Sequence, residues 1–323
     1  MPAVATDRTS DTILIAGAGA IGSVVGGLLA RAGWSVTLLG RGRHLEAVRR
    51  GGLSVEGLFG THRVEGLTCV GDAGACRGPY DAIFLTVKAW DTSVAARAVA
   101  PALAPDGVLV SLQNGLGNVE AAAAAVGGER VLGGRVIFGA EVIEPGRVSV
   151  TVYADPVLIG PPSPGHDPRA IAWAARLAAA GIPAAPTGAL MAELWAKVLY
   201  SAALNPLGAL LGLTYGALAT DPDTRAIMDT VIDEAFAVAR AEGVAFPWAD
   251  VGSYRDTFYG RLVPATAGHR SSMLQDIERG RPTEIDAING EVAARAVRHG
   301  LPVPVNLALA RLIRARARRA EAA

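Results

Sequence analysis

Apolar and polar positions follow two different patterns along this chain. In its first half, short apolar runs of strand length recur, and stretches that suit helices lie between them. The clearest apolar runs cover residues 12–16, 35–39, 81–87 and 107–113. Strands that alternate with helical segments predict an α/β domain built on a parallel sheet.

The pattern changes after residue 187. Several short β-like runs between 131 and 160, with a turn at 144–146, predict the last strands of the first domain. A helix is predicted over 167–180, and from 188 onward helical periodicity dominates. We therefore predict a Rossmann-type dinucleotide-binding domain over 11–187, followed by an all-α domain over 188–323.

The turn between the first strand and the first helix has the sequence GAGAIG, at 17–22. A GxGxxG motif in that context predicts dinucleotide binding. Gly17 permits the tight turn, Gly19 lets the backbone approach a pyrophosphate, and Gly22 lets the helix pack on the strand. The helix N-terminus offers N–H groups to the anion.

Arg41 stands at the end of the second predicted strand, where enzymes that prefer NAD place a carboxylate. A carboxylate would repel a 2′-phosphate, whereas arginine attracts it. The turn at 40–43 therefore favours NADP(H), although a basic surface turn is the alternative interpretation. Lys88 and Asn114 follow two further strands, so all three side chains are expected at the same sheet edge as the glycine loop.

A strongly apolar helix is predicted at the start of the second domain. Lys197, Ser201 and Asn205 recur along it at spacings that place them on one face. Burial lowers the pKa of an amine, so a buried lysine is a competent proton donor near neutral pH. The alternative is a lysine paired with Glu193, one turn earlier.

A second polar segment lies near residue 280. Ser271 and Ser272 suit a helix N-cap, and Thr283 with Asp286 resembles a capping box. This arrangement would leave Glu284 in the first turn of the next helix, either as a complement to the helix dipole or as the partner of a lysine.

Composition narrows the class of ligand. Lys plus Arg and Asp plus Glu both number 30, so no net charge attracts nucleic acid or an anionic membrane. Cys69 and Cys76 lack the spacing of a zinc site, and no metal is expected. The first eleven residues are polar, and no uncharged apolar run reaches the length of about 18 residues needed for a membrane span. We expect a cytoplasmic protein with a small-molecule substrate, and the apolar helical domain is compatible with a homodimer.

The chain resembles the ketopantoate reductase (2-dehydropantoate 2-reductase) family from about residue 12 to the C-terminal helix. The motifs that carry the resemblance are GAGAIG at 17–22, TVKAWD at 86–91, QNGLGN at 113–118, AELWAKVLYSAALNPLGAL at 192–210 and SSMLQDIERGRPTEIDAING at 271–290. This similarity implies NADPH-dependent reduction of ketopantoate to D-pantoate, a step towards pantothenate and coenzyme A.

The resemblance also implies roles for single residues. Lys197 matches the family's catalytic lysine, which donates the proton, and Glu284 matches its active-site acid. Asn205 and Ser272 match residues that bind substrate, whereas Ser201 and His269 stand where better-known members have asparagines. The positions that match cofactor contacts are Gly17, Ala18, Gly19, Ala20, Ile21, Gly22, Arg41, Lys88, Asn114 and Ala140.

Two other functions are compatible with the sequence. Because Ser201 and His269 depart from the family pattern, a reductase of the same fold could act on another 2-oxo acid, as a D-2-hydroxyacid dehydrogenase does. A nucleotide-binding sensor without catalysis is the third hypothesis. It is disfavoured because a sensor would need only the residues of the first domain, yet Lys197 and Glu284 are both present.

Overall fold

The computed structural model describes residues 11–321, so the polar stretch at 1–10 lies outside it. The described chain forms two compact units. The first contains residues 11–113 and 118–190, and the second contains 114–117 and 191–321. The prediction placed the whole of 11–187 in one domain, whereas the structure assigns the loop at 114–117 to the second unit.

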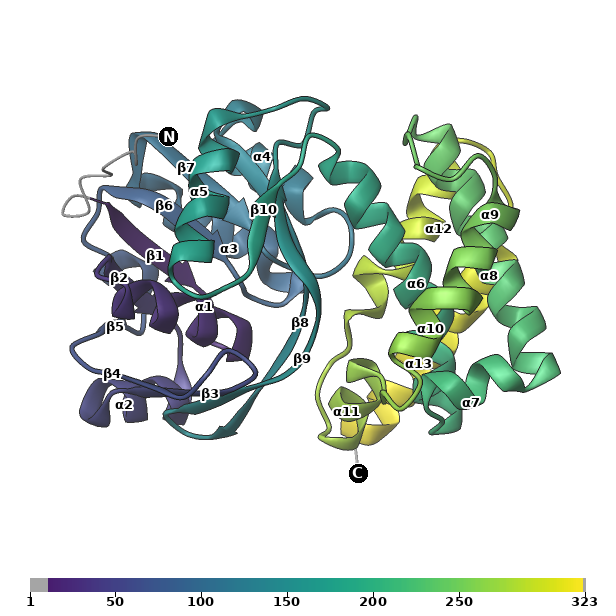
Figure 1. The fold of residues 1–323 in the computed structure, drawn as a ribbon, viewed down its shortest axis with the longest axis horizontal. Coiled ribbons are helices and arrows are strands. Elements are labelled where there is room, and N and C mark those ends of the chain that lie inside the picture. The colour runs from purple at the N-terminus through teal and green to yellow at the C-terminus, as the bar shows by residue number, and fades with distance from the viewer. Residues whose placement is uncertain (1–10, 322–323) are drawn as a thin grey trace. The chain divides into compact units, whose positions relative to one another are not determined.

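The first unit is built on one mixed sheet, drawn in Figure 1. Its strands follow the order β4-β3-β9-β8-β7-β6-β1-β2-β5, and β10 pairs with β9. The strands are β1 Thr12–Ala16, β2 Ser35–Leu39, β3 Leu53–Gly57, β4 His62–Val64, β5 Thr68–Val70, β6 Tyr80–Leu85, β7 Leu103–Ser111, β8 Val131–Glu144, β9 Arg147–Gly160 and β10 Ala184–Pro186.

The centre of this sheet is parallel, as the sequence predicts. β1 pairs in parallel with β2 and β6, and β7 pairs in parallel with β6 and β8. The strands predicted between 131 and 160 and the turn at 144–146 are confirmed, but the strands are two long ones rather than several short ones. This segment forms one long antiparallel hairpin of β8 and β9, which turns at Pro145 and Gly146.

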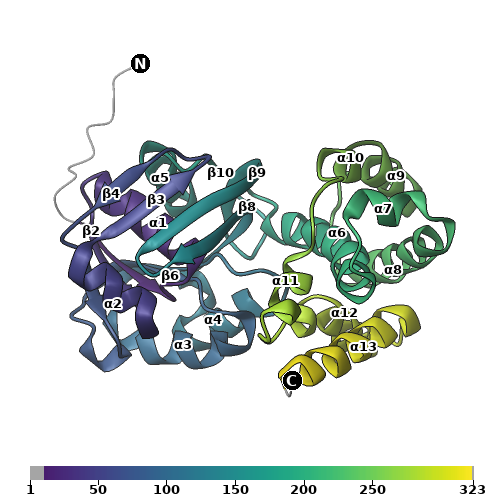
Figure 2. The same ribbon diagram turned by 90° about the horizontal axis from the view of Figure 1, so that it is seen from below.

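Helices cover both faces of the sheet. In Figure 2, α1 and α5 lie on one face, whereas α3 and α4 lie on the other. Their bounds are α1 Ala20–Arg31, α2 Gly42–Gly51, α3 Thr92–Val99, α4 Asn118–Val126 and α5 Pro168–Ala179, with short 3-10 helices η1 Ala73–Ala75, η2 Ala89–Asp91, η3 Ala100–Ala102 and η4 Gly128–Arg130. The predicted helix at 167–180 is confirmed, and Asp167 caps it by accepting a hydrogen bond from the Arg169 N–H.

Among the described residues, the second unit is entirely helical. Its helices are α6 Leu190–Leu211, α7 Tyr215–Thr220, α8 Pro222–Ala241, α9 Val251–Thr257, α10 Val263–Ala265, α11 Ser272–Glu278, α12 Asn289–Arg298 and α13 Pro304–Glu321, with the π-helix η5 Phe258–Leu262 and the 3-10 helix η6 Glu284–Ala287. The predicted fold class, a dinucleotide-binding α/β sheet followed by an all-α region, is confirmed.

Helix α6 is the apolar centre of the second unit. By length and composition it could cross a membrane, but 67% of its apolar window is buried inside the protein. The core helix of a soluble protein has the same properties, so burial among its neighbours accounts for its composition.

Pro206 interrupts the hydrogen bonding of α6. Proline has no N–H, so the carbonyl four residues earlier, that of Ala202, loses its helical donor. The side chain of Asn289 replaces it, since its Nδ2 donates to the Ala202 carbonyl at 3.1 Å and to Oδ1 of Asn306 at 2.9 Å. Asn289 is fully buried, and it joins the start of α12 to α6.

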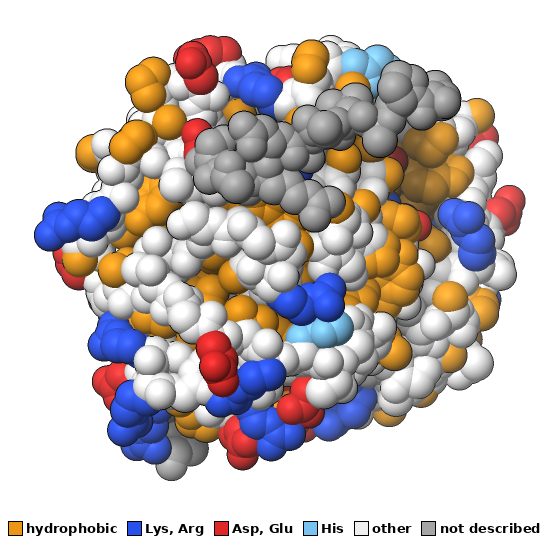
Figure 3. All heavy atoms as spheres, turned by 60° about the vertical axis from the view of Figure 1, so that its left-hand side comes forward, with side chains coloured by type: hydrophobic (Ala, Val, Ile, Leu, Met, Phe, Trp, Pro, Cys, Tyr) orange, Lys and Arg blue, Asp and Glu red, His pale blue; other side chains and the backbone are white. Residues whose placement is uncertain are grey.

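On the face shown in Figure 3, basic and acidic side chains lie among one another and form no patch of one sign. This distribution agrees with equal totals of basic and acidic residues. Cys69 and Cys76 are unbridged.

Candidate active site

The glycine loop of the first unit lies between β1 and α1. Gly17 has φ +119°, and a Cβ there would lie 2.5 Å from the Val87 nitrogen. A Cβ on Gly22 would overlap the carbonyl oxygen of Gly17. Gly19 differs, because a Cβ on it would meet no atom within 4 Å. Two glycines are therefore required by packing, and the third faces open space.

Some backbone amides of this loop donate hydrogen bonds within the protein, and others lie at the start of α1. Those of Gly17 and Ala18 both donate to the Leu39 carbonyl at 2.9 Å. Ala20 and Ile21 form the first turn of α1, where N–H groups have no partner within the helix. Open space beside Gly19 and donors at the start of α1 fit the pyrophosphate of a dinucleotide.

Arg41 and Lys88 lie next to this loop in the first unit. Arg41 is exposed and is the N-cap residue of α2, and its neighbour Gly40 approaches Ala18 closely. Lys88 is exposed, and its ammonium lies 5.9 Å from the ring centroid of Trp90.

Ala140 lies within β8, where it pairs with Val150. It packs against the same apolar core as Ala18 and Ile21, two residues of the glycine loop. Its contact with a cofactor stays a prediction.

The second unit brings three polar side chains together. Lys197 Nζ donates a hydrogen bond to Oδ1 of Asn114, and Asn114 Nδ2 donates to Oε2 of Glu284 at 3.2 Å. We call these three residues the catalytic bridge. Asn114 thus lies between the lysine and the glutamate. The cofactor contact that the sequence predicts for it stays a prediction.

Backbone contacts hold Asn114 in the catalytic bridge. Gly115 has φ +84°, and a Cβ there would overlap the carbonyl oxygen of Ala287 and lie 2.7 Å from its Cβ. The Leu116 N–H donates to the same carbonyl at 2.8 Å. The 114–117 loop therefore packs directly on the backbone of η6, which carries Glu284.

The predicted capping box at Thr283 is wrong. Glu284–Ala287 forms a 3-10 helix, and the Thr283 side chain makes no capping hydrogen bond there. Asp286, which would complete the box, instead accepts a hydrogen bond from Arg314 Nε at 2.6 Å. Glu284 still stands in the first turn, half-buried, and its carboxylate accepts the hydrogen bond from Asn114.

The predicted substrate residues lie on two segments of the second unit. Ser201 is half-buried on α6, and Asn205 is buried one turn further along it. His269 is half-buried in the loop before α11, and burial lowers the pKa of its imidazole. Ser272 is the exposed first residue of α11, whose N-cap is the buried Ser271.

Tyr215 links these segments and was not singled out from the sequence. Its hydroxyl donates to Oδ1 of Asn205 at 2.5 Å, and its ring meets that of His269 edge-on at 5.1 Å between centroids. A buried aromatic residue at the start of a helix is indistinguishable in the sequence from an ordinary core residue, so no signal could have identified it.

A lysine hydrogen-bonded to an amide, which in turn is hydrogen-bonded to a carboxylate, can stabilise a developing oxyanion and then supply its proton. Together with a glycine loop that fits a dinucleotide, these features define the class of the nicotinamide-dependent oxidoreductases.

Comparisons with known proteins identify the family. Residues 13–164 match the family model "Ketopantoate reductase PanE/ApbA", and residues 189–317 match its C-terminal model. A 2-dehydropantoate 2-reductase of Aquifex aeolicus is 36% identical over 308 residues, covering 94% of this chain and 96% of that protein. The chain belongs to the ketopantoate reductase family.

Solved structures agree with this assignment. A PanE/ApbA family ketopantoate reductase from Ralstonia eutropha JMP134 has a TM-score of 0.85 and 34% identity, with 96% of this chain and 99% of that chain covered. D-mandelate dehydrogenase, in a ternary structure with NADH and anilino(oxo)acetate, has a TM-score of 0.86 and 25% identity at the same coverage. The family and these neighbours support a nicotinamide dinucleotide as the cofactor.

Proposed function

We propose that this chain catalyses the NADPH-dependent reduction of ketopantoate to D-pantoate. The observation that carries the proposal is the catalytic bridge of Lys197, Asn114 and Glu284. Membership of the ketopantoate reductase family and the similarity to 2-dehydropantoate 2-reductases support this choice of substrate.

The residues of the bridge have distinct roles in this proposal. When bound, NADPH supplies the hydride that reduces the C2 carbonyl. The Lys197 ammonium stabilises the negative charge that develops on the carbonyl oxygen and then donates a proton to it. Asn114 and Glu284 hold the ammonium in position, since one hydrogen-bonds to it and the other hydrogen-bonds to that amide.

Binding roles complete the proposal. Ser272 and His269 hold the substrate carboxylate, and Ser201 and Asn205 face the rest of the substrate. The residues proposed to hold the cofactor are Gly17, Ala18, Gly19, Ala20, Ile21, Gly22, Arg41, Lys88, Asn114 and Ala140.

We infer NADP(H) rather than NAD(H) from the end of β2. Arg41 is exposed there, and no carboxylate occupies the turn at 40–43 that would repel a 2′-phosphate. We propose that residues 11–187 form the cofactor-binding domain and that residues 188–323 form the substrate-binding domain. We propose that the enzyme is cytoplasmic, and its helical domain is compatible with a homodimer.

A second candidate substrate is a bulkier 2-oxo acid. Two observations favour it. One is the similarity to D-mandelate dehydrogenase. The other is the aromatic ring of Tyr215, which contacts Asn205 and His269 and packs edge-on against the ring of Tyr200. Aromatic walls suit a substrate that carries a ring.

Steady-state NADPH oxidation with a panel of 2-oxo acids tests both candidates. We expect the highest kcat/KM with ketopantoate, and D-pantoate as the product. A higher value with 2-oxo-2-phenylacetate would instead support the second candidate. Tight NADPH binding with no turnover of any 2-oxo acid would refute both.

A further inference from the structure

The hydroxyl of Tyr215 is hydrogen-bonded to the side chain of Asn205. Tyr215 begins α7, Asn205 lies in α6, and their side chains are joined by a hydrogen bond of 2.5 Å from the phenol to Oδ1. Both residues are buried, with 3% of Tyr215 and 8% of Asn205 exposed. A hydrogen bond between buried groups is costly to break, because water cannot replace the lost partner.

This bond fixes the orientation of the Asn205 carboxamide. An amide has one acceptor oxygen and one NH2 donor, so fixing the oxygen also fixes the donor. Burial raises the pKa of the Tyr215 phenol, which therefore keeps its proton and acts as the donor. Nδ2 of Asn205 is consequently directed away from Tyr215.

Neighbouring groups hold the Tyr215 ring in place. The backbone N–H of Tyr215 donates to the His269 carbonyl at 3.1 Å, and the Tyr215 ring packs edge-on against the rings of His269 and Tyr200. The Tyr200 hydroxyl is itself hydrogen-bonded to Thr266 Oγ1 at 2.6 Å. The phenol oxygen therefore cannot leave Asn205 by a simple rotation of the side chain.

We propose that Tyr215 is a positioning residue for substrate binding, which holds Asn205 with its Nδ2 donor turned towards an acceptor oxygen of the 2-oxo acid. The inference rests on the proposed function, because that function places Asn205 at the substrate. It also predicts selectivity for ligands that offer a hydroxyl, carbonyl or carboxylate oxygen at this position over ligands that offer an ammonium group.

The substitution Tyr215→Phe tests the proposal, since it removes the hydroxyl and keeps the ring. We expect KM for ketopantoate to rise about tenfold, which corresponds to the loss of one hydrogen bond at a buried group. The expected kcat stays within about threefold, and KM for NADPH is unchanged, because an interaction made equally in ground and transition states affects KM alone.

A double substitution separates positioning from packing. If Tyr215 acts through Asn205, the variant Tyr215→Phe/Asn205→Ala has the same KM for ketopantoate as Asn205→Ala alone. A merely structural role of Tyr215 would instead add its own effect to that of Asn205→Ala.

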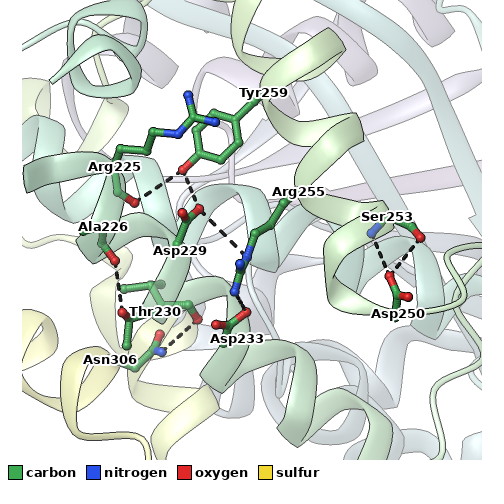
Figure 4. Close-up of polar contacts among 11 residues, drawn as sticks. Arg225, Ala226, Asp229, Thr230, Asp233, Asp250, Ser253, Arg255, Tyr259 and Asn306 are labelled. Carbon is green, nitrogen blue, oxygen red and sulfur yellow. Dashed lines mark hydrogen bonds and ion pairs between the residues drawn. The ribbon is translucent and has the colours of Figure 1, made fainter. Parts of the chain in front are cut away.

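Tyr259→Phe is the matched control. Figure 4 shows the Tyr259 hydroxyl donating to Asp229 Oδ1, at 2.7 Å, with the guanidinium of Arg225 over its ring. This variant loses the same atom from a phenol that is hydrogen-bonded away from Asn205. We expect a small decrease in the unfolding temperature and no change in either KM.

Three outcomes would overturn the inference. An unchanged KM for ketopantoate in Tyr215→Phe, in an otherwise active enzyme, refutes the inference alone. Additive effects in the double variant also refute it alone. A wild-type enzyme that turns over no 2-oxo acid refutes the proposed function, and the inference with it.

Discussion

The glycine loop and the catalytic bridge are built in opposite ways. The loop consists of six consecutive residues, and its binding surface is backbone and open space, because Gly17 and Gly22 have no room for a side chain. The bridge consists of three side chains, and Asn114 stands 83 residues from Lys197 and 170 from Glu284. In the proposed function, the loop holds the phosphates of the dinucleotide, whereas the bridge stabilises and protonates the carbonyl oxygen of the substrate.

The largest expected effect is at the lysine of the bridge. Lys197→Ala should lower kcat by about 10²–10⁴-fold, the usual contribution of a positioned general acid. The dissociation constant for NADPH should stay nearly unchanged, which a fluorescence titration can measure. The substitution Lys88→Ala should instead weaken NADPH binding and leave kcat nearly unchanged. If both variants changed kcat and the dissociation constant for NADPH alike, the separate roles of Lys197 and Lys88 would be contradicted.

A substitution at Arg41, next to the glycine loop, tests the preference for NADPH over NADH. Arg41→Glu should reverse the preference between NADPH and NADH, lowering kcat/KM for NADPH by about 10- to 100-fold, because a charged hydrogen bond to the phosphate is replaced by repulsion. Arg43→Glu makes the same change of charge two residues further on and should have little effect. An unchanged cofactor preference in Arg41→Glu would show that Arg41 is only a basic surface residue.

Gly115 tests whether the bridge also depends on close backbone packing. A Cβ at this position would overlap the Ala287 carbonyl, so Gly115→Ala should displace Asn114 and lower kcat by about tenfold. The cost in the free energy of unfolding should be about 1–3 kcal/mol, as for other overpacked sites. Gly128→Ala is the control, since a Cβ there meets no atom within 4 Å. If Gly115→Ala matched the control, the close packing of the loop would be irrelevant to catalysis.

The smallest expected effect concerns His44, in the first unit. Its Nδ1 accepts a hydrogen bond from the Gly146 N–H at 3.1 Å, and burial lowers its pKa from the ordinary value of 6.5, against a weaker opposing effect of a backbone contact at Glu144. As the pH falls below 6.5, His44 of the unfolded chain binds a proton before His44 of the folded protein does. The stabilisation is therefore complete above pH 6.5 and is lost as the pH falls through the lowered pKa.

Urea unfolding at pH 7.5 and 5.5 measures this effect. The wild type should lose more stability at the lower pH than His44→Gln, which has no titrating ring. Equal losses in the two proteins would mean that His44 does not contribute to the pH dependence.

Much of the fold could be predicted from local patterns. The runs at 12–16 and 35–39 form β1 and β2 as predicted, because central parallel strands are apolar without interruption. The β8–β9 hairpin was predicted as several short strands. Gly133, Gly134 and Gly139 interrupt the apolar pattern of β8, and its pairing with β9 continues past all three glycines.

The candidate site also has residues that the sequence predicts and contacts that it does not. Lys197 stood out because a charged residue in an apolar helix is unusual, and the glycine loop stood out because its motif is continuous. The contact of Asn114 with Lys197 and Glu284 could not be predicted, because it depends on a loop packing on a distant backbone. The role inferred for Tyr215 likewise needs the positions of two helices.

Chemical rescue shows directly whether the amine of Lys197 supplies the proton. Turnover of ketopantoate by Lys197→Ala is measured at saturating NADPH with increasing ethylamine. If the Lys197 amine is the proton donor, the rate rises with the concentration of ethylammonium, while the wild type and Lys88→Ala do not respond. A Lys197→Ala enzyme that turns over at the wild-type rate without any added amine would contradict this role of Lys197.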